Sequence, residues 1–378
     1  MAAEVRQGSV QRCWGTLFVA VFILTGACRE GDSPGGPGSF SFGIEPGESG
    51  ANGCVGEAAV FVAPVTPIVV PLVGYEAGAS GQVTAAGEAE VLYLTGSEGR
   101  VWAVDVDDPA APLMEELLSS GLVEAFLSVL GSATVPVLGG LRAMDAEKLV
   151  VMETATHCLL EVDRCSAGSV RLFAGDPASG AGYLDGVASF ARFDWNPRCQ
   201  PFVAAGSPPD VWIPDANNHA VRIVSGGSVL TLVGGMGAGA LDGDVEVASL
   251  DSPLGISATC AGTLLILEGG GRLRALESIG HAFFGWQGGE VSTLASGLFG
   301  PASPITSSDD EVYWVDSDSG VLRRYVEGVV DCPLAVDCDA ALAAPAFTPG
   351  AVLSLTRTPS GALFVLDAST STLYFIGS

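Results

Sequence analysis

The sequence predicts an all-β protein, namely a six-bladed β-propeller of four-stranded antiparallel blades whose last blade is closed by an N-terminal strand. Two observations lead to this prediction. A pattern of two short apolar runs joined by an acidic or polar turn recurs six times along the 378 residues. Its copies lie about fifty residues apart, which suits a propeller blade better than the shorter repeat of a solenoid.

The clearest copy of the pattern spans residues 211–224. Its apolar runs are rich in Val, Ile and Trp, which favour a pleated, half-buried surface. Between them, Asp215, Asn217 and Asn218 can bond their own backbone in a tight turn. One hairpin cannot bury its apolar face alone in water, so further copies are expected. The residues at this turn position, 58, 62, 53, 48 and 51 residues apart, are Thr95, Glu153, Asp215, Glu268, Asp316 and Asp367.

A finer pattern occurs twice between residues 170 and 260. Both copies contain a Leu-Asp-Gly segment ahead of the hairpin, preceded by an apolar pair ending in Gly. The segments that carry the pattern are 172–175, 182–186, 190–193, 215–222, 232–235, 241–243 and 253–256. This pattern resembles the NHL repeat. The resemblance implies a ring of the kind that commonly binds protein, glycan or other polymers, while similar six-bladed rings include metal-dependent lactonases and amidating lyases.

The N-terminus has the features of an export signal. The apolar run 14–27 is too short to span a bilayer but has the length of a signal-peptide core. The small residues just before Cys28 resemble the lipobox of bacterial lipoproteins, which implies that Cys28 is diacylated and becomes the mature N-terminus. A plain secretory signal with an incidental cysteine is the alternative. We therefore expect a signal peptide with a lipobox over residues 1–28.

A flexible tether is expected next, over residues 29–55, because 11 of the 25 residues from 29 to 53 are Gly or Pro. We then expect the propeller to span residues 56–378. The sixth hairpin ends at Ile376, so its blade needs an outer strand from elsewhere, and we expect residues 58–72 to supply it and cover the exposed edge. Apolar residues at helical spacing over 112–130 predict a helix that could cap one mouth of the ring, with a strand as the alternative.

Seven cysteines remain when Cys13 and Cys28 are set aside with the signal. An oxidising compartment allows disulfides, and no spacing matches a zinc ribbon or a redox Cys-x-x-Cys motif. Cys332 and Cys338, which close a short loop, are the first expected pair. Cys158 and Cys199 are the second, since both are expected to emerge on the same face of the ring. An odd number leaves one thiol free or intermolecular.

The net charge of −27 limits the partners. An acidic surface repels phosphate backbones and acidic lipids, so nucleic acid is excluded and a membrane is contacted only through the N-terminal lipid. Two roles are open for the turn acids. They could line one end of the ring and attract a cation, or, as is commoner, tie the turn backbone. The acids concerned are Asp215, Glu268, Asp316 and Asp367. Arg222 and Arg323 follow their acids by seven residues and are expected to pair with them or with a neighbouring blade.

Few residues point to catalysis or a cofactor. Residues 316–320 resemble the start of a calcium loop, but a hairpin turn explains them better, so no cofactor is expected although calcium is possible. The three histidines, His157, His219 and His281, are scattered, and we assign neither catalytic nor metal-ligating residues. The leading hypothesis is a non-enzymatic binding or scaffolding module at the bacterial cell envelope, with a protein or glycan partner. The alternatives are a metal-dependent hydrolase or lyase with its site in the central channel, and a structural part of an envelope complex.

Overall fold

The computed structural model describes residues 66–78, 80–85, 90–165, 168–204, 209–259, 262–277, 279–282, 285–298, 300–306 and 311–377. The expected signal peptide, Cys28 and the tether lie outside these residues. Within these ranges, none of the helices combines the length and the hydropathy that a bilayer crossing requires.

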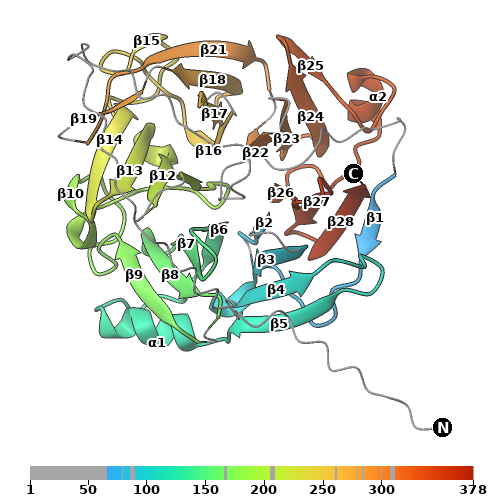
Figure 1. Ribbon diagram of the computed structural model, residues 1–378, viewed down its shortest axis with the longest axis horizontal. Helices are drawn as coiled ribbons and strands as arrows, with labels where there is room; N and C mark the ends of the chain where they lie inside the picture. The colour runs from blue at the N-terminus through green and yellow to red at the C-terminus, as the bar shows by residue number, and fades with distance from the viewer. Residues whose placement is uncertain are drawn as a thin grey trace, which may run out of the picture.

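Six antiparallel sheets surround a common axis, so the expected six-bladed β-propeller is confirmed (Figure 1). From the axis outward, blade 1 contains β2 (Val83–Ala85), β3 (Val91–Thr95), β4 (Val101–Asp105) and β5 (Leu113–Leu118). Blade 2 contains β6 (Leu138–Ala143), β7 (Lys148–Glu153), β8 (Cys158–Asp163) and β9 (Val170–Ala174). Blade 3 contains β11 (Phe202–Ala204), β12 (Asp210–Asp215), β13 (Ala220–Ser225), β14 (Ser228–Gly234) and the short β10 (Gly186–Val187).

The second half of the chain continues the pattern. Blade 4 contains β16 (Pro253–Ala258), β17 (Leu264–Glu268), β18 (Arg272–Glu277), β21 (Glu290–Ser296) and the short β15 (Gly243–Asp244). Blade 5 contains β22 (Pro301–Thr306), β23 (Val312–Asp316), β24 (Val321–Val326) and β25 (Val329–Asp331). Blade 6 contains β26 (Leu353–Arg357), β27 (Leu363–Asp367), β28 (Thr372–Gly377) and β1 (Ile68–Val70). A separate hairpin, β19 (Gly280–Ala282) and β20 (Gly285–Gln287), extends from blade 4.

The ring is closed by pairing the two ends of the described chain, as expected. β1 is the outermost strand of blade 6 and runs antiparallel to β28, with Val70 opposite Leu373. Val70 is only 2% exposed and packs in one apolar cluster with Leu373 and Phe364. The closing strand therefore gains side-chain burial as well as backbone hydrogen bonds, and it covers the edge that β28 would otherwise leave unpaired.

The expectation of a continuous helix over residues 112–130 is wrong in its first half. Residues 113–118 form β5, the outer strand of blade 1, and α1 (Leu122–Val129) begins only after Gly121, whose φ of 79° breaks the chain direction. α1 buries Val123 and Leu127 in a core that also contains residues of blades 1 and 2. It lies at the perimeter of the ring in Figure 1, away from the axis, so it does not cap a mouth.

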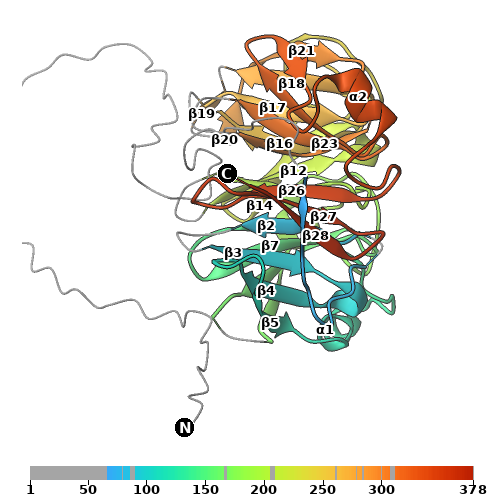
Figure 2. The same cartoon turned by 90° about the vertical axis from the view of Figure 1, so that its right-hand side faces the viewer.

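The core lies between neighbouring blades. Each large apolar cluster combines residues of two adjacent sheets, as where Trp212 of blade 3 packs with Ile256 and Ile266 of blade 4. Because side chains alternate between the two faces of a strand, successive residues of one strand pack against the two different adjacent blades. Viewed from the side, the ring carries β19 and β20 towards one face, and α1 and the short α2 (Cys338–Ala343) towards the other (Figure 2).

Candidate functional site

The six residues at the repeated turn position end the second strand of their blades, and all six are fully buried. Their main partners are backbone N–H groups of the segment that leads into the innermost strand of the same blade. Thus Glu153 Oε1 accepts from Val137 N at 2.8 Å, and Asp215 Oδ1 accepts from Asp194 N at 2.7 Å. The corresponding bonds of Thr95, Glu268 and Asp367 are to Gln82 N, Asp251 N and Thr348 N. These bonds tie each turn to the chain entering the axis.

The turn acid of blade 5, Asp316, is held by side chains of the two strands that it joins. Its carboxylate accepts hydrogen bonds from Trp314 Nε1 at 2.9 Å and from Arg323 Nε at 2.7 Å. The expected pairing of Arg323 with Asp316 is therefore confirmed. The expected pairing of Arg222 with Asp215 is confirmed too, with Nη1 and Oδ2 2.8 Å apart.

A buried arginine also explains the Leu-Asp-Gly segments. Arg222 Nε donates to Asp185 at 2.9 Å, and the guanidinium lies over the ring of Tyr183 at 4.8 Å. Blade 4 repeats the arrangement with Arg274, which bridges Glu268 at 3.0 Å and Asp242 at 2.6 Å. Asp185 and Asp242 also bind the fourth strand of their sheets, because each accepts a hydrogen bond from a backbone N–H of that strand. The finer sequence pattern thus supplies partly exposed aspartates to ion-pair networks centred on buried arginines.

Burial opposes ionisation of these acids. It raises the pKa of Asp215 to about 6, although Asn218, the Asp194 N–H and Arg222 act in the other direction. It also raises the pKa of Glu268, against the effect of Arg274. The donors therefore hold carboxylates that desolvation would otherwise protonate.

Two histidines occupy one structural position in successive blades. His157 and His219 follow their turn acids by four residues and have left-handed φ values of 55° and 52°. Each Nδ1 accepts a backbone N–H from the next blade, from Trp195 at 3.2 Å and from Ser252 at 3.1 Å. Burial lowers the pKa of His157, opposed by Asp194 and Glu153. These histidines join blades, and the described side chains contain no group of three or more His, Cys, Asp or Glu placed to hold a metal ion.

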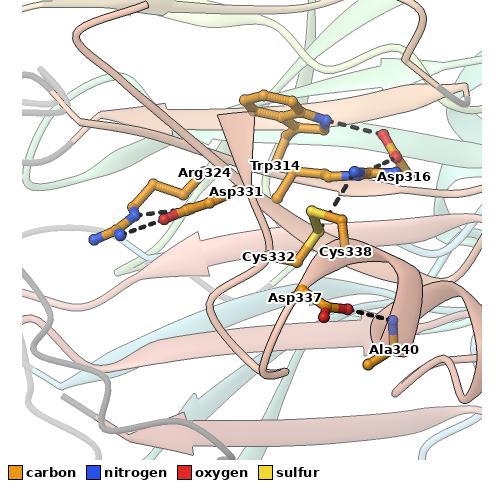
Figure 3. Close-up of a disulfide and its surroundings, with 9 residues drawn as sticks. Trp314, Asp316, Arg324, Asp331, Cys332, Asp337, Cys338 and Ala340 are labelled. Carbon is orange, nitrogen blue, oxygen red and sulfur yellow. Dashed lines mark hydrogen bonds and ion pairs between the residues drawn. A yellow bond between two sulfur atoms is a disulfide. The ribbon is translucent and has the colours of Figure 1, made fainter. Parts of the chain in front are cut away.

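One of the two expected disulfides is confirmed. Cys332 and Cys338 are bonded beside Arg323, whose Nη1 lies 3.4 Å from Cys332 Sγ, and they join the outer edge of blade 5 to α2 (Figure 3). The pairing of Cys158 with Cys199 is wrong, because both are free and buried. Cys158 faces the core that blade 2 shares with blade 1, and Cys199 faces the core shared with blade 3. Cys165 is disulfide-bonded as well.

The axis of the ring is crossed by polar side chains that the sequence did not single out. The innermost strands are edge strands, so their outer N–H and C=O groups need partners. Ser354 Oγ of blade 6 accepts from Val83 N at 3.1 Å. Gln200, which leads into blade 3, donates its Nε2 to Val83 O at 3.1 Å and to Ser354 Oγ at 3.2 Å. Gln82 likewise donates to Pro197 O at 3.1 Å.

Arg142 on β6 of blade 2 adds hydrogen bonds to residues of blades 1 and 3, so the polar side chains on the axis connect three consecutive blades. Its Nε donates to Pro201 O at 3.1 Å, Nη1 to Thr84 Oγ1 at 3.3 Å, and Nη2 to Gln200 Oε1 at 3.4 Å. Burial lowers the pKa of Arg142 to about 10, so the group is still charged at neutral pH. Residue 140 must be glycine because its backbone lies close to that of Cys199: a Cβ at this position would lie 2.3 Å from Cys199 O.

A shallow cavity of about 500 Å³ opens where the chain enters the innermost strands of blades 3, 4 and 6. We call this end of the channel the turn-side mouth, because the turns after the second strands lie there, and the opposite end the far mouth. The residues that give the cavity its chemistry are Asn196, Arg198, Asp251, Ser252, Leu254 and Val352. Arg198 also reaches blade 5, where it pairs with Asp318 at 2.8 Å.

No protein-family model and no curated protein matches the chain. Among solved structures, a streptogramin B lyase is 12% identical, with 82% of this chain and 96% of that chain covered and a TM-score of 0.50. A virginiamycin B lyase from Staphylococcus aureus is 11% identical, with 83% and 99% covered and the same TM-score. A gluconolactonase from Xanthomonas campestris is 13% identical, with 86% and 99% covered, also at 0.50. At such identities the likeness is one of fold, and it agrees with the six blades described above: the chain is a six-bladed β-propeller.

Proposed function

We propose that the protein is an exported, lipid-anchored, NHL-like propeller that acts as a non-enzymatic binding module at the bacterial cell envelope. The cavity at the turn-side mouth is the observation that carries the proposal. It is wide and shallow, it is built from the entering segments of three blades, and its rim combines Arg198, Asp251 and Asn196 with the apolar Leu254 and Val352. Such a mixed, open surface suits a segment of a protein or glycan that is held without being enclosed.

The chemistry next to this cavity supports binding rather than catalysis. His219 uses its Nδ1 to accept the Ser252 N–H, so that nitrogen is already engaged. Cys199, two residues from the cavity residue Pro197, is a buried thiol whose pKa burial raises to about 12. A thiol that remains protonated is neither a nucleophile nor a metal ligand at neutral pH.

A metal-dependent hydrolase or lyase is the second candidate. It draws support from the polar side chains that gather on the axis, among them Arg142 and Gln200, and from the lyases and the lactonase that share the fold. A fold shared at this level does not assign an activity, since function resides in the residues of a site. A stoichiometric divalent ion retained by the purified protein would favour this candidate.

The proposed location at the cell envelope is based on Cys28 and on the disulfides. Disulfides such as Cys332–Cys338 persist in extracytoplasmic compartments, which supports export. Mass spectrometry of the mature N-terminus, after expression in a bacterium, should find a diacylglyceryl group on Cys28. The Cys28→Ala variant should lose the lipid and leave the membrane fraction. An unacylated mature N-terminus in the wild type would contradict the anchor.

Photo-crosslinking in intact cells tests the binding site. A crosslinking amino acid replaces Val352, which lines the cavity, or Val329, which is 60% exposed on the outermost strand of blade 5. A partner held at the turn-side mouth should give a discrete adduct from position 352 and none from 329. Digestion of the adduct with a protease or a glycanase then distinguishes a protein from a glycan. Equal labelling at both positions, or none at 352, would overturn the proposed site.

A further inference from the structure

Arg142 is a half-buried cation whose hydrogen bonds all go to uncharged acceptors. In the described part of the chain, no carboxylate lies within ion-pair distance of it, whereas Arg198, Arg222, Arg274 and Arg323 all have acidic partners. An unpaired charge inside a protein carries a desolvation cost that only an opposite charge fully offsets. In a chain of net charge −27, the lack of such a partner at the axis is a specific feature of this site.

The two terminal nitrogens of Arg142 are only weakly engaged. Nη1 and Nη2 lie 3.3 Å and 3.4 Å from Thr84 Oγ1 and Gln200 Oε1, whereas N–H···O bonds are commonly near 2.9 to 3.0 Å. The stronger bond, from Nε to Pro201 O at 3.1 Å, fixes the side chain. The outer edge of the guanidinium can therefore exchange two long bonds to neutral oxygens for two short bonds to one anion.

Arg142 lies towards the far mouth of the channel. Gln82 and Gln200 cross the axis near the turn-side mouth, through their bonds to Pro197 O, Val83 O and Ser354. Thr84 and Arg142 lie further along β2 and β6, and Arg142 is half-buried, so part of it remains open to solvent. Thr84 itself is fully buried, and its hydroxyl donates to Ala85 O at 3.2 Å.

We propose that Arg142 forms a binding site for a small monocarboxylate at the far end of the axial channel. The planar guanidinium offers two parallel N–H donors, which match the two oxygens of a carboxylate. One cation balances one negative charge, and the acidic protein repels ligands of higher charge such as phosphate and sulfate. The site is separate from the cavity at the turn-side mouth and does not depend on what that cavity binds.

Calorimetric titration of the purified protein with acetate and with gluconate, at constant ionic strength, tests the proposal. Arg Nε–Hε signals observed by NMR in the same titrations identify the side chain that responds. We expect saturable carboxylate binding that shifts the Arg142 signal. Arg142→Gln should weaken binding about tenfold to a hundredfold, since it removes charged hydrogen bonds. Thr84→Val, which keeps the shape of this buried residue but removes the acceptor of Nη1, should not weaken binding, because the ligand replaces that bond.

Arg171→Gln is the matched control, because it removes the same charge from an exposed position on β9 of the same blade. It should change the affinity less than about twofold, through long-range electrostatics alone. Arg142→Lys keeps the charge but loses the two parallel N–H donors, so it should still weaken binding, and it serves as the test variant if Arg142→Gln does not fold. The proposal is overturned if no saturable binding occurs, if sulfate binds as tightly as acetate, or if Arg171→Gln matches the Arg142 variants.

Discussion

The buried arginine of blade 3 gives the sharpest test of how the repeated residues work. Arg222 is inaccessible to solvent, and its guanidinium joins Asp215 at 2.8 Å to Asp185 and to Leu184 O. The Arg222→Met change keeps much of the side-chain length but removes every one of these bonds. It leaves the Asp215 carboxylate buried without its counter-charge.

The expected loss of stability is large. Removing one partner of a buried ion pair typically costs about 3 to 5 kcal/mol. For the span 66–377, an unfolding entropy of about 2.1 cal/mol/K per residue converts this into a fall in Tm of about 5 to 8 °C. Arg274→Met should cost about as much, since Arg274 makes the equivalent bonds in blade 4.

Differential scanning calorimetry of the variants provides the measurement, and Arg324→Met provides the control. Arg324 also pairs with acids, Asp331 at 2.5 Å and Glu311 at 3.4 Å, but its own side chain is 26% exposed. A surface pair is worth about 0 to 1 kcal/mol, or less than about 2 °C in Tm here. Equal falls in Tm for Arg222→Met and Arg324→Met would refute the view that the repeated acids and arginines stabilise the individual blades.

Three further predictions concern pH, the disulfide and the closing strand. Because burial raises the pKa of Asp215 from 3.8 to about 6, the native state binds a proton more readily than the unfolded state between these values. The free energy of unfolding of the wild type, relative to that of Asp215→Asn, should therefore increase by up to about 3 kcal/mol as the pH falls from 7 to 4. Urea denaturation measures both values, and a difference between the two proteins that does not change with pH would contradict the prediction. The double variant Cys332→Ser, Cys338→Ser opens a loop of sequence separation 6, and its free energy of unfolding should fall by about 2 kcal/mol. This loss should appear as a lower denaturation midpoint, and an unchanged midpoint would count against the disulfide. Val70→Asp buries a charge in β1 and should cost about 3 kcal/mol or more, whereas Val69→Asp on the same strand, at a position 58% exposed, should cost under about 1 kcal/mol; equal sensitivity to proteolysis would argue against closure by β1.

The architecture was predictable because its signals are local and repeated. Each blade needs a hairpin with an apolar face and a turn that satisfies its own backbone, so the turn position of Asp215 recurs in every copy. Closure by β1 followed from one missing strand in the sixth blade. The Cys332–Cys338 pair was predictable for the same reason, since seven residues of chain hold both cysteines close together.

Features that depend on register or on several blades at once were not predictable. Cys158 and Cys199 both lie near the turn-side mouth, but alternation along β8 directs Cys158 towards blade 1. In the stretch 112–130 the apolar spacing suits both periods, and only Gly121 marks the change from strand to helix. Arg274 was missed as a partner of Glu268 because it follows after six residues rather than seven.

The side chains on the axis were missed for a related reason, which also bears on function. The acids and arginines that repeat from blade to blade stabilise each blade internally. Arg142, Gln200 and Ser354, by contrast, occur once each and satisfy the free edges of the innermost strands. Any ligand in the channel must therefore replace existing hydrogen bonds. A neutral ligand would exchange one set of such bonds for another and gain little, because net hydrogen-bond energies are small. A carboxylate gains in addition the attraction of an uncompensated guanidinium, so charge rather than hydrogen bonding decides which ligands the axis can select.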